Sequence, residues 1–258
     1  MKNRVKTILA RAKQTTIKEF SYSRAASRPK KILFDHLPKC GGSALNAYLK
    51  AHYPRRRTFA TDGYTPIVSV DEFKKFPERK RYSYDLVKGH LAHELLDFVH
   101  PECVKVTVLR EPVERIVSHY YYAKRNPAHY LHAKIHDSDM GLEEYASSDL
   151  SGELRNWYTT HYSGMAAEDA ESRPEESVAK AFEVVSRYDV VGFLDNFPTF
   201  AETLRSLANL RCEYQNVKVN ATEDRPALDR VDPAALATIQ QVNHLDIALY
   251  QKIRDAVG

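Results

Sequence analysis

The stretch KILFDHLPKCGGSALNAYLK, residues 31–50, constrains the fold of this chain more than any other segment. Its apolar residues 32–34 read as a short strand, and apolar residues return at helical spacing after a Pro- and Gly-containing turn. Gly41 and Gly42 let the backbone approach an anion, while Ser43 can cap the helix and donate its hydroxyl. The free N–H groups of the first helical turn point at such a ligand, and Lys39 adds a positive charge. The stretch predicts a phosphate-binding strand, loop and helix.

This loop differs from the G-x-x-x-x-G-K-[ST] pattern of common nucleotide hydrolases, because Lys39 precedes the two glycines. Two adjacent glycines before a helix can also serve only a tight turn. The loop is therefore expected to hold phosphates without being an ordinary ATPase loop.

The length of 258 residues suits one compact domain, which we place at residues 31–258. Residues 1–30 form a basic N-terminal arm that is expected to be solvated and partly disordered, with peripheral contact to an anionic surface as the other interpretation. The chain holds 38 Lys and Arg against 34 Asp and Glu. This mild excess fits an anionic ligand and does not demand nucleic acid as a partner.

Three cysteines, Cys40, Cys103 and Cys212, lie far apart without C-x-x-C spacing. The spacing predicts neither a zinc site nor a disulfide framework, and it is consistent with a reducing compartment. The sequence shows no apolar run of membrane-spanning length and no secretory signal. We therefore expect a cytoplasmic protein without a membrane span.

A second strand followed by a helix begins at residues 104–109, VKVTVL, the clearest strand in the chain. Arg110 follows it, Pro112 suits the first turn of a helix, and Ser118 lies about two turns further on. Further strands are expected near residues 84–89 and 190–194, with helices at 174–187, 196–210 and 233–257, and loops at 125–138 and 165–173. Strands that alternate with helices predict an α/β fold around a parallel sheet.

Arg110 stands where a buried strand becomes a helix, which is the usual ligand edge of an open α/β sheet. Its planar guanidinium can hold a terminal phosphate through paired hydrogen bonds, with Ser118 as a further donor. The alternative is that Arg110 pairs with Glu111 or Glu114 merely to cap the sheet.

These motifs resemble those of carbohydrate sulfotransferases that use 3′-phosphoadenosine 5′-phosphosulfate (PAPS). HLPKCGGSAL resembles the 5′-phosphosulfate loop and LREPVERIVSHYYY the 3′-phosphate segment, while KGHLAHELLDF is similar to a segment of the heparan sulfate 2-O-sulfotransferase-like branch. RNWYTTHYSG and VNHLDIALY look like later landmarks, and the similarity runs from residue 31 to near the C-terminus. Cys40 stands where a threonine is usual, and Glu111 replaces a common aspartate.

The resemblance implies a P-loop-like three-layer fold and transfer of a sulfuryl group from PAPS to a hydroxyl of a carbohydrate or glycan, with no metal. Lys39 would meet the bridging and 5′-phosphate oxygens, assisted by the backbone of Cys40 and the N–H groups of residues 41–44, from Gly41 to Ala44. The resemblance implies that His90 is the general base, and the near-neutral reference pKa of imidazole suits proton abstraction. His93 and Glu94 are rivals for this role.

Other residues are predicted as ligand contacts. Arg155, Asn156 and Arg55, the first residue of a basic triplet, are candidates for acceptor binding. Thr222 and Arg225 lie in a loop that could fold over the nucleotide.

Two rival functions remain open at this stage. A P-loop kinase or nucleotide hydrolase would use Asp195 as its magnesium carboxylate, but it leaves Arg110 and Ser118 without a role. A nucleic-acid or anionic-polymer binding module would rely on the basic arm, and it gives no reason for a Gly-Gly loop in an α/β core.

Overall fold

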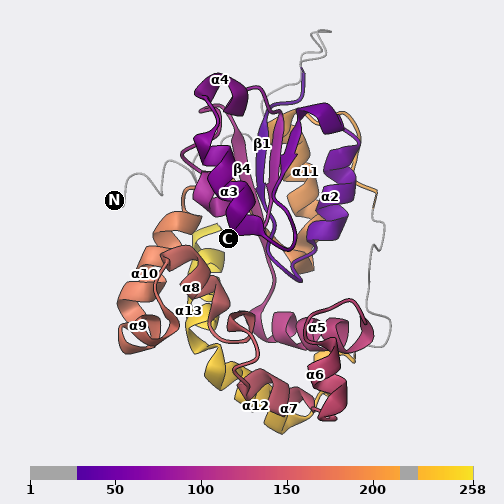
Figure 1. Cartoon of the computed structure of the whole chain (residues 1–258), viewed down its shortest axis with the longest axis vertical. Helices are drawn as coiled ribbons and strands as arrows, with labels where there is room; N and C mark the ends of the chain where they lie inside the picture. The colour runs from indigo at the N-terminus through magenta and orange to yellow at the C-terminus, as the bar shows by residue number, and fades with distance from the viewer. Residues whose placement is uncertain (1–27, 216–225, 258) are drawn as a thin grey trace.

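The computed structural model describes residues 28–215 and 226–257 of the chain (Figure 1). These residues form one sheet of parallel strands in the order β2-β3-β1-β4-β5. The strands are β1 (Ile32–Asp35), β2 (Thr58–Ala60), β3 (Leu86–Gly89), β4 (Val104–Leu109) and β5 (Val190–Phe193). The loop that follows β1 lies at the centre of the sheet, where the strand order reverses, and this is where open α/β sheets bind ligands.

The helices alternate with the strands and continue beyond them in a larger helical region. They are α2 (Gly42–Lys50), α3 (Pro66–Lys75), α4 (Glu78–Arg81), α5 (Pro112–Arg125), α6 (His132–Asp137), α7 (Leu142–Ser147), α8 (Trp157–Ser163), α9 (Ala167–Ser172), α10 (Pro174–Val185), α11 (Phe197–Ala208), α12 (Pro233–Val242) and α13 (His244–Val257). Short 3-10 turns are η1 (Arg55–Arg57), η2 (Ala92–Leu95), η3 (Gly152–Leu154), η4 (Leu194–Asn196) and η5 (Leu228–Arg230).

Side chains that alternate along β1 build a core on each face of the sheet. Ile32 and Phe34 face α2 and α11, which lie side by side in Figure 1. Leu33 faces the other way, toward buried residues of α3, α8, α10 and α13. Because successive side chains of a strand point to opposite faces, four residues of β1 fix both layers.

A helical region extends beyond the sheet and contains α5, α6, α7 and α12 (Figure 1). Two smaller apolar clusters hold it together, one centred on Ile116 of α5 and Ile239 of α12, and one around Tyr145 of α7. Since α5 begins directly after β4, this region is attached to the ligand edge of the sheet.

The predicted α/β fold with a parallel sheet is confirmed, and three local predictions were wrong. The expected helix 233–257 is divided at Asn243, whose side chain donates to the Leu154 carbonyl and accepts from the Asn156 N–H. The expected loops 165–173 and 125–138 contain the helices α9 and α6. No helix among the described residues combines the length and apolar composition needed to cross a bilayer.

Gly192 in β5 is a site where packing excludes any side chain. A Cβ there would stand 2.3 Å from the Phe200 ring, whereas a Cβ at the exposed Gly63 meets nothing within 4 Å. We expect Gly192→Ala to lower the free energy of unfolding by about 1–3 kcal/mol, because the core must shift to accept the methyl group. Chemical denaturation of this variant and of Gly63→Ala checks the prediction, which requires a clear loss in the first variant only.

Candidate active site

The predicted anion-binding segments meet at the carboxyl edge of the sheet. The loop 36–41 follows β1, His90 follows β3 and Arg110 follows β4, and β3 and β4 are the two hydrogen-bonded neighbours of β1. Parallel strands end at the same edge, so these three segments are brought together by the topology alone.

The loop before α2 is held in an uncommon backbone conformation. Gly41 is the N-cap of α2 with φ 78°, and Lys39 also has a positive φ of 63°. A left-handed backbone is costly for a side-chain-bearing residue such as Lys39, and such conformations cluster at ligand sites. Ser43 does not cap the helix as predicted, because α2 begins at Gly42. The Ala44 N–H already donates to the Gly41 carbonyl at 3.0 Å, so Gly42 and Ser43 carry the first-turn amides that face outward from the helix end.

The Lys39 ammonium lies over the ring of Tyr122, with Nζ 3.5 Å from the ring centroid. Tyr122 belongs to α5, so this cation–π contact joins the β1 loop to the helical region. Spacing alone does not show which ring lies opposite a lysine, so the sequence could not indicate this contact.

Arg110 reaches back to the same loop. Its Nη1 donates to the Lys39 carbonyl at 3.3 Å, and its Nε and Nη2 donate to the Glu114 carboxylate at 3.2 and 3.1 Å. The Glu111 carboxylate caps α5 by accepting from the Glu114 N–H at 2.7 Å, which explains why an acid suits position 111. Ser118 lies two turns along α5 and is 5% exposed. Lys39 and Arg110 therefore share one edge.

Tyr158 of α8 fastens the two loops together. Its hydroxyl lies 3.0 Å from Cys40 Sγ, accepts from the Arg110 N–H at 3.2 Å and donates to the Arg110 carbonyl at 3.0 Å. Burial raises the pKa of the Cys40 thiol, which keeps it protonated. The Cys40 side chain thus supports the loop from inside, and only its backbone can face a ligand.

His90 stacks on the ring of His36, with centroids 4.8 Å apart and an interplanar angle of 22°. The Thr61 hydroxyl donates to the His90 carbonyl at 3.0 Å and fixes the backbone there. Of the rival bases, Glu94 is exposed and pairs with Lys74 at 2.6 Å. The ring of His93 instead lies 4.0 Å from that of His161.

His93 belongs to a buried cluster with Asp35 and His161, whose ligand atoms lie within 4.8 Å of one another. Such a trio could hold a metal ion, but the Asp35 carboxylate already accepts hydrogen bonds from Tyr162, Tyr188 and the His93 N–H. Burial lowers the pKa of His161 well below its ordinary value, and the positive charges of neighbouring groups act in the same direction. A neutral imidazole can serve as a metal ligand, and the absence of a metal requirement stays a prediction.

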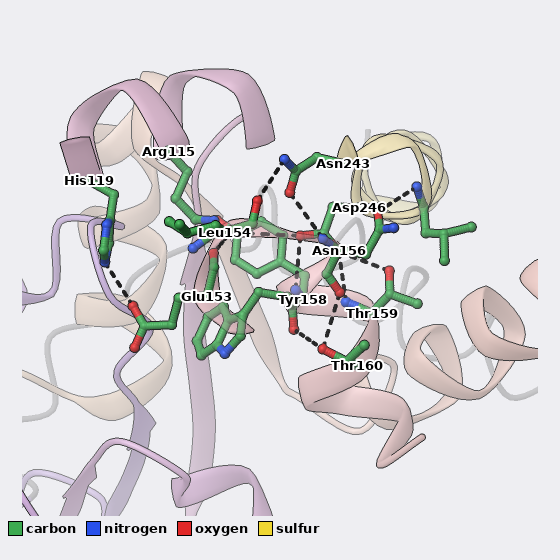
Figure 2. Close-up of polar contacts among 12 residues, drawn as sticks. Arg115, His119, Glu153, Leu154, Asn156, Tyr158, Thr159, Thr160, Asn243 and Asp246 are labelled. Carbon is green, nitrogen blue, oxygen red and sulfur yellow. Dashed lines mark hydrogen bonds and ion pairs between the residues drawn. The ribbon is translucent and has the colours of Figure 1, made fainter. Parts of the chain in front are cut away.

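A carboxylate that the sequence interpretation missed lies beside His119 of α5. Glu153 Oε2 is 3.0 Å from His119 Nε2 (Figure 2). The other ring nitrogen of His119, Nδ1, is 2.6 Å from the Tyr145 hydroxyl. Burial alone would raise the pKa of Glu153, but the His119 hydrogen bond and the charges of His119, Arg115 and His90 lower it. The segment 151–154 carried no motif, and only the tertiary contact reveals this ionised group.

Asn156 is buried at 2% exposure and joins α8 to α13 (Figure 2). Its side chain donates to Glu171 and accepts from the Leu245 N–H at 2.9 Å. These contacts engage both ends of the amide, so the predicted contact of Asn156 with an acceptor is not supported. Arg155 is exposed and lies 3.8 Å from Asp149, and its acceptor contact stays a prediction.

Arg55 lies at the wrong edge of the sheet for the predicted acceptor contact. Residues 55–57 precede β2, and Arg57 pairs with Asp85, which precedes β3. The amino ends of these strands lie opposite the edge that carries Lys39, so this prediction is corrected. Thr222 and Arg225 lie outside the described residues, as does most of the basic arm.

The fold and site define an α/β protein with two cationic loops at one edge of a parallel sheet. A sequence model described as "Sulfotransferase family" matches residues 25–252. The chain therefore belongs to the sulfotransferase family and is an enzyme that transfers a sulfuryl group to a hydroxyl-bearing acceptor. A comparison with curated proteins gives no match.

Asp246 of α13 anchors the helix that carries Tyr158 (Figure 2). Its buried carboxylate accepts from the Tyr158 and Thr159 N–H groups at 2.9 and 2.8 Å and lies 4.0 Å from Arg115 Nη2. We expect Asp246→Asn to lower the free energy of unfolding by about 3 kcal/mol, because it leaves Arg115 uncompensated and faces an amide toward N–H donors. Denaturant titration measures the loss, and the exposed control Asp229→Asn should stay within about 0.5 kcal/mol of the parent protein.

Proposed function

We propose that the protein transfers the sulfuryl group of PAPS to a hydroxyl of a carbohydrate or glycan, with His90 as general base. The acceptor oxygen attacks sulfur, the bond from sulfur to the 5′-phosphate oxygen breaks, and His90 takes the hydroxyl proton. The products are the sulfate ester and 3′,5′-bisphosphoadenosine.

The observation that carries this proposal is the junction of the two cationic loops, where Arg110 Nη1 bonds to the Lys39 carbonyl at 3.3 Å. A nucleotide with phosphate groups at both its 3′ and 5′ positions needs two anion sites in one place. Lys39 and the amides of Gly42 and Ser43 suit the 5′-phosphosulfate, where negative charge builds as the leaving phosphate departs. Arg110, with Ser118 two turns further along α5, suits the 3′-phosphate.

The position of His90 supports its role as base. It follows β3, the strand next to β1, and its ring stacks on a residue of the loop that starts after β1. His93 is packed against His161 and Glu94 is paired with Lys74, which leaves His90 as the best candidate of the three. General base catalysis of this kind needs a positioned imidazole beside the attacking hydroxyl.

The carboxylate of Glu153 indicates where the acceptor lies. PAPS is polyanionic, so an ionised carboxylate near His90 suits the acceptor side of the site better than the donor side. Tyr130 is 60% exposed, and its hydroxyl lies 2.7 Å from Ser151 Oγ on the same segment as Glu153. A carboxylate beside an exposed aromatic ring offers a sugar both hydrogen bonding and an apolar surface.

The kinase alternative loses support from the placement of Asp195. Its carboxylate forms an ion pair with Arg254, and the guanidinium neutralises the negative charge that would otherwise attract a magnesium ion. Lys39 also precedes the glycines, unlike the lysine of a kinase or hydrolase loop that holds both phosphate and metal.

Nucleotide preference tests the donor. We expect 3′,5′-bisphosphoadenosine without metal to raise the unfolding temperature more than ATP with magnesium or an oligonucleotide does, because only the bisphosphate fills both cationic loops.

Arg110→Ala should weaken the binding of 3′,5′-bisphosphoadenosine about 10-fold to 100-fold through the loss of charge-assisted hydrogen bonds. Arg79→Ala on α4 is the matched control. A preference for ATP with magnesium, or equal affinity in the Arg110 variant, would contradict the assignment.

His90→Ala tests the base. We expect sulfuryl transfer to fall roughly 10²-fold to 10⁴-fold, because the attacking hydroxyl loses its proton acceptor. Affinity for the bisphosphate, measured by calorimetry, should change less than about 3-fold. Transfer from radiolabelled PAPS to a glycan mixture measures activity. His100→Ala is the control, because this histidine makes only an edge-to-face ring contact with Tyr82, the residue after α4. Full activity in the His90 variant would place the base elsewhere.

A further inference from the structure

His36 is the first residue after β1, and the mechanism proposed above gives it no role. Its ring lies between two others: the Phe34 ring is 5.5 Å away at an angle of 21°, and the His90 ring is 4.8 Å away at 22°. The stack therefore runs from the core of the sheet to the proposed base. Because the His36 ring is itself stacked on Phe34, it fixes the plane of the His90 ring that stacks on its other side.

The same ring also touches the phosphosulfate loop. A Cβ at Gly42 would stand 1.8 Å from His36 Cδ2 and 2.0 Å from His36 Nε2. Only glycine at position 42 leaves room for this imidazole. His36 Nε2 thus lies against the first residue of α2, beside the backbone amides that face the bound anion.

Two neighbours fix the position of the proton on His36. Lys88 Nζ lies 2.8 Å from Asn46 Oδ1, and an ammonium group can only donate, so the oxygen of the amide faces Lys88. The amide nitrogen then faces His36 Nδ1 at 3.3 Å. Because an amide NH₂ can only donate, Nδ1 must accept, and in a neutral imidazole the proton lies on Nε2.

The surroundings also keep His36 uncharged. Burial lowers the pKa of His36 to about 3, and the positive charge of Lys88 and any proton on His90, the two titratable neighbours, act in the same direction. This neutrality suits the chemistry, because a charged ring stacked on His90 would repel the proton that His90 takes from the acceptor.

We propose that His36 is a second functional histidine: a neutral imidazole, held as the Nε2–H tautomer by Asn46 and Lys88, that donates its N–H to the sulfuryl group and orients His90. The sulfuryl group must lie between the loop-bound 5′-phosphate and the base, and the His36 ring contacts both Gly42 of the loop and His90. No described residue bonds to His36 Nε2, so this N–H is available to a ligand. The role rests on the proposed sulfuryl transfer, whereas the tautomer does not.

Nitrogen NMR of the ring-labelled protein tests the tautomer without any substrate. The His36 signals, identified by their loss in His36→Phe, should show a protonated Nε2 and an unprotonated Nδ1 with no titration between pH 5.5 and 8. Asn46→Asp places a carboxylate beside Nδ1 and should move a proton onto that atom. Ala47→Asp, with the same charge on the exposed side of α2, should leave the His36 signals unchanged. A protonated Nδ1 in the parent protein, or titration near pH 6.5, overturns the inference.

Donor binding and turnover test the role. His36→Phe keeps a stacked ring and removes the N–H, so we expect at least a 10-fold loss in PAPS affinity or in kcat. Affinity for 3′,5′-bisphosphoadenosine, which has no sulfuryl group, should change less than 2-fold. Equal changes for the two nucleotides, or unchanged turnover, overturn the proposed role of His36. If the parent protein transfers no sulfuryl group while the NMR result holds, the proposed function fails and the tautomer assignment stands.

Discussion

The hydroxyl of Tyr158 is the contact on which the site depends. It bonds to the Cys40 thiol of one anion loop and to both backbone groups of Arg110 in the other. Burial raises the pKa of Tyr158 far above its usual value, so the phenol stays protonated and can donate and accept at once. One side chain from a later helix therefore fixes the spacing of the two loops.

Tyr158 is itself held by residues far along the chain. Asp246 accepts from its N–H, and Asn156 at the start of α8 bonds to the N–H groups at the start of α13 (Figure 2). The C-terminal helix thus supports the active site without contributing to it. The C-terminal helix is interrupted at Asn243, whose side chain bonds to the Leu154 carbonyl and to the Asn156 N–H. The interruption therefore brings Asn243 into the hydrogen-bond network that holds α8.

The charges of the site divide it by function. Lys39 and Arg110 are cationic and suit the donor nucleotide, whereas Glu153 of η3 adds an ionised carboxylate beside His119. His36 and His90, which follow β1 and β3, form a stacked pair. A site that moves a sulfuryl group needs positive charge where the phosphate leaves and a proton acceptor where the hydroxyl attacks. The division of the site into a cationic part and a histidine pair matches these two needs.

The sequence by itself determined the strands β1, β3, β4 and β5, the Gly-Gly loop and the two cations. Each depends on local signals: apolar runs, turn residues and a charge at a strand end. Only the tertiary structure showed that Glu153 lies beside His119, that Arg55 stands at the opposite edge, and that the His36 ring packs against Gly42. Residues far apart in the chain make these contacts, and periodicity carries no information on which distant side chains meet.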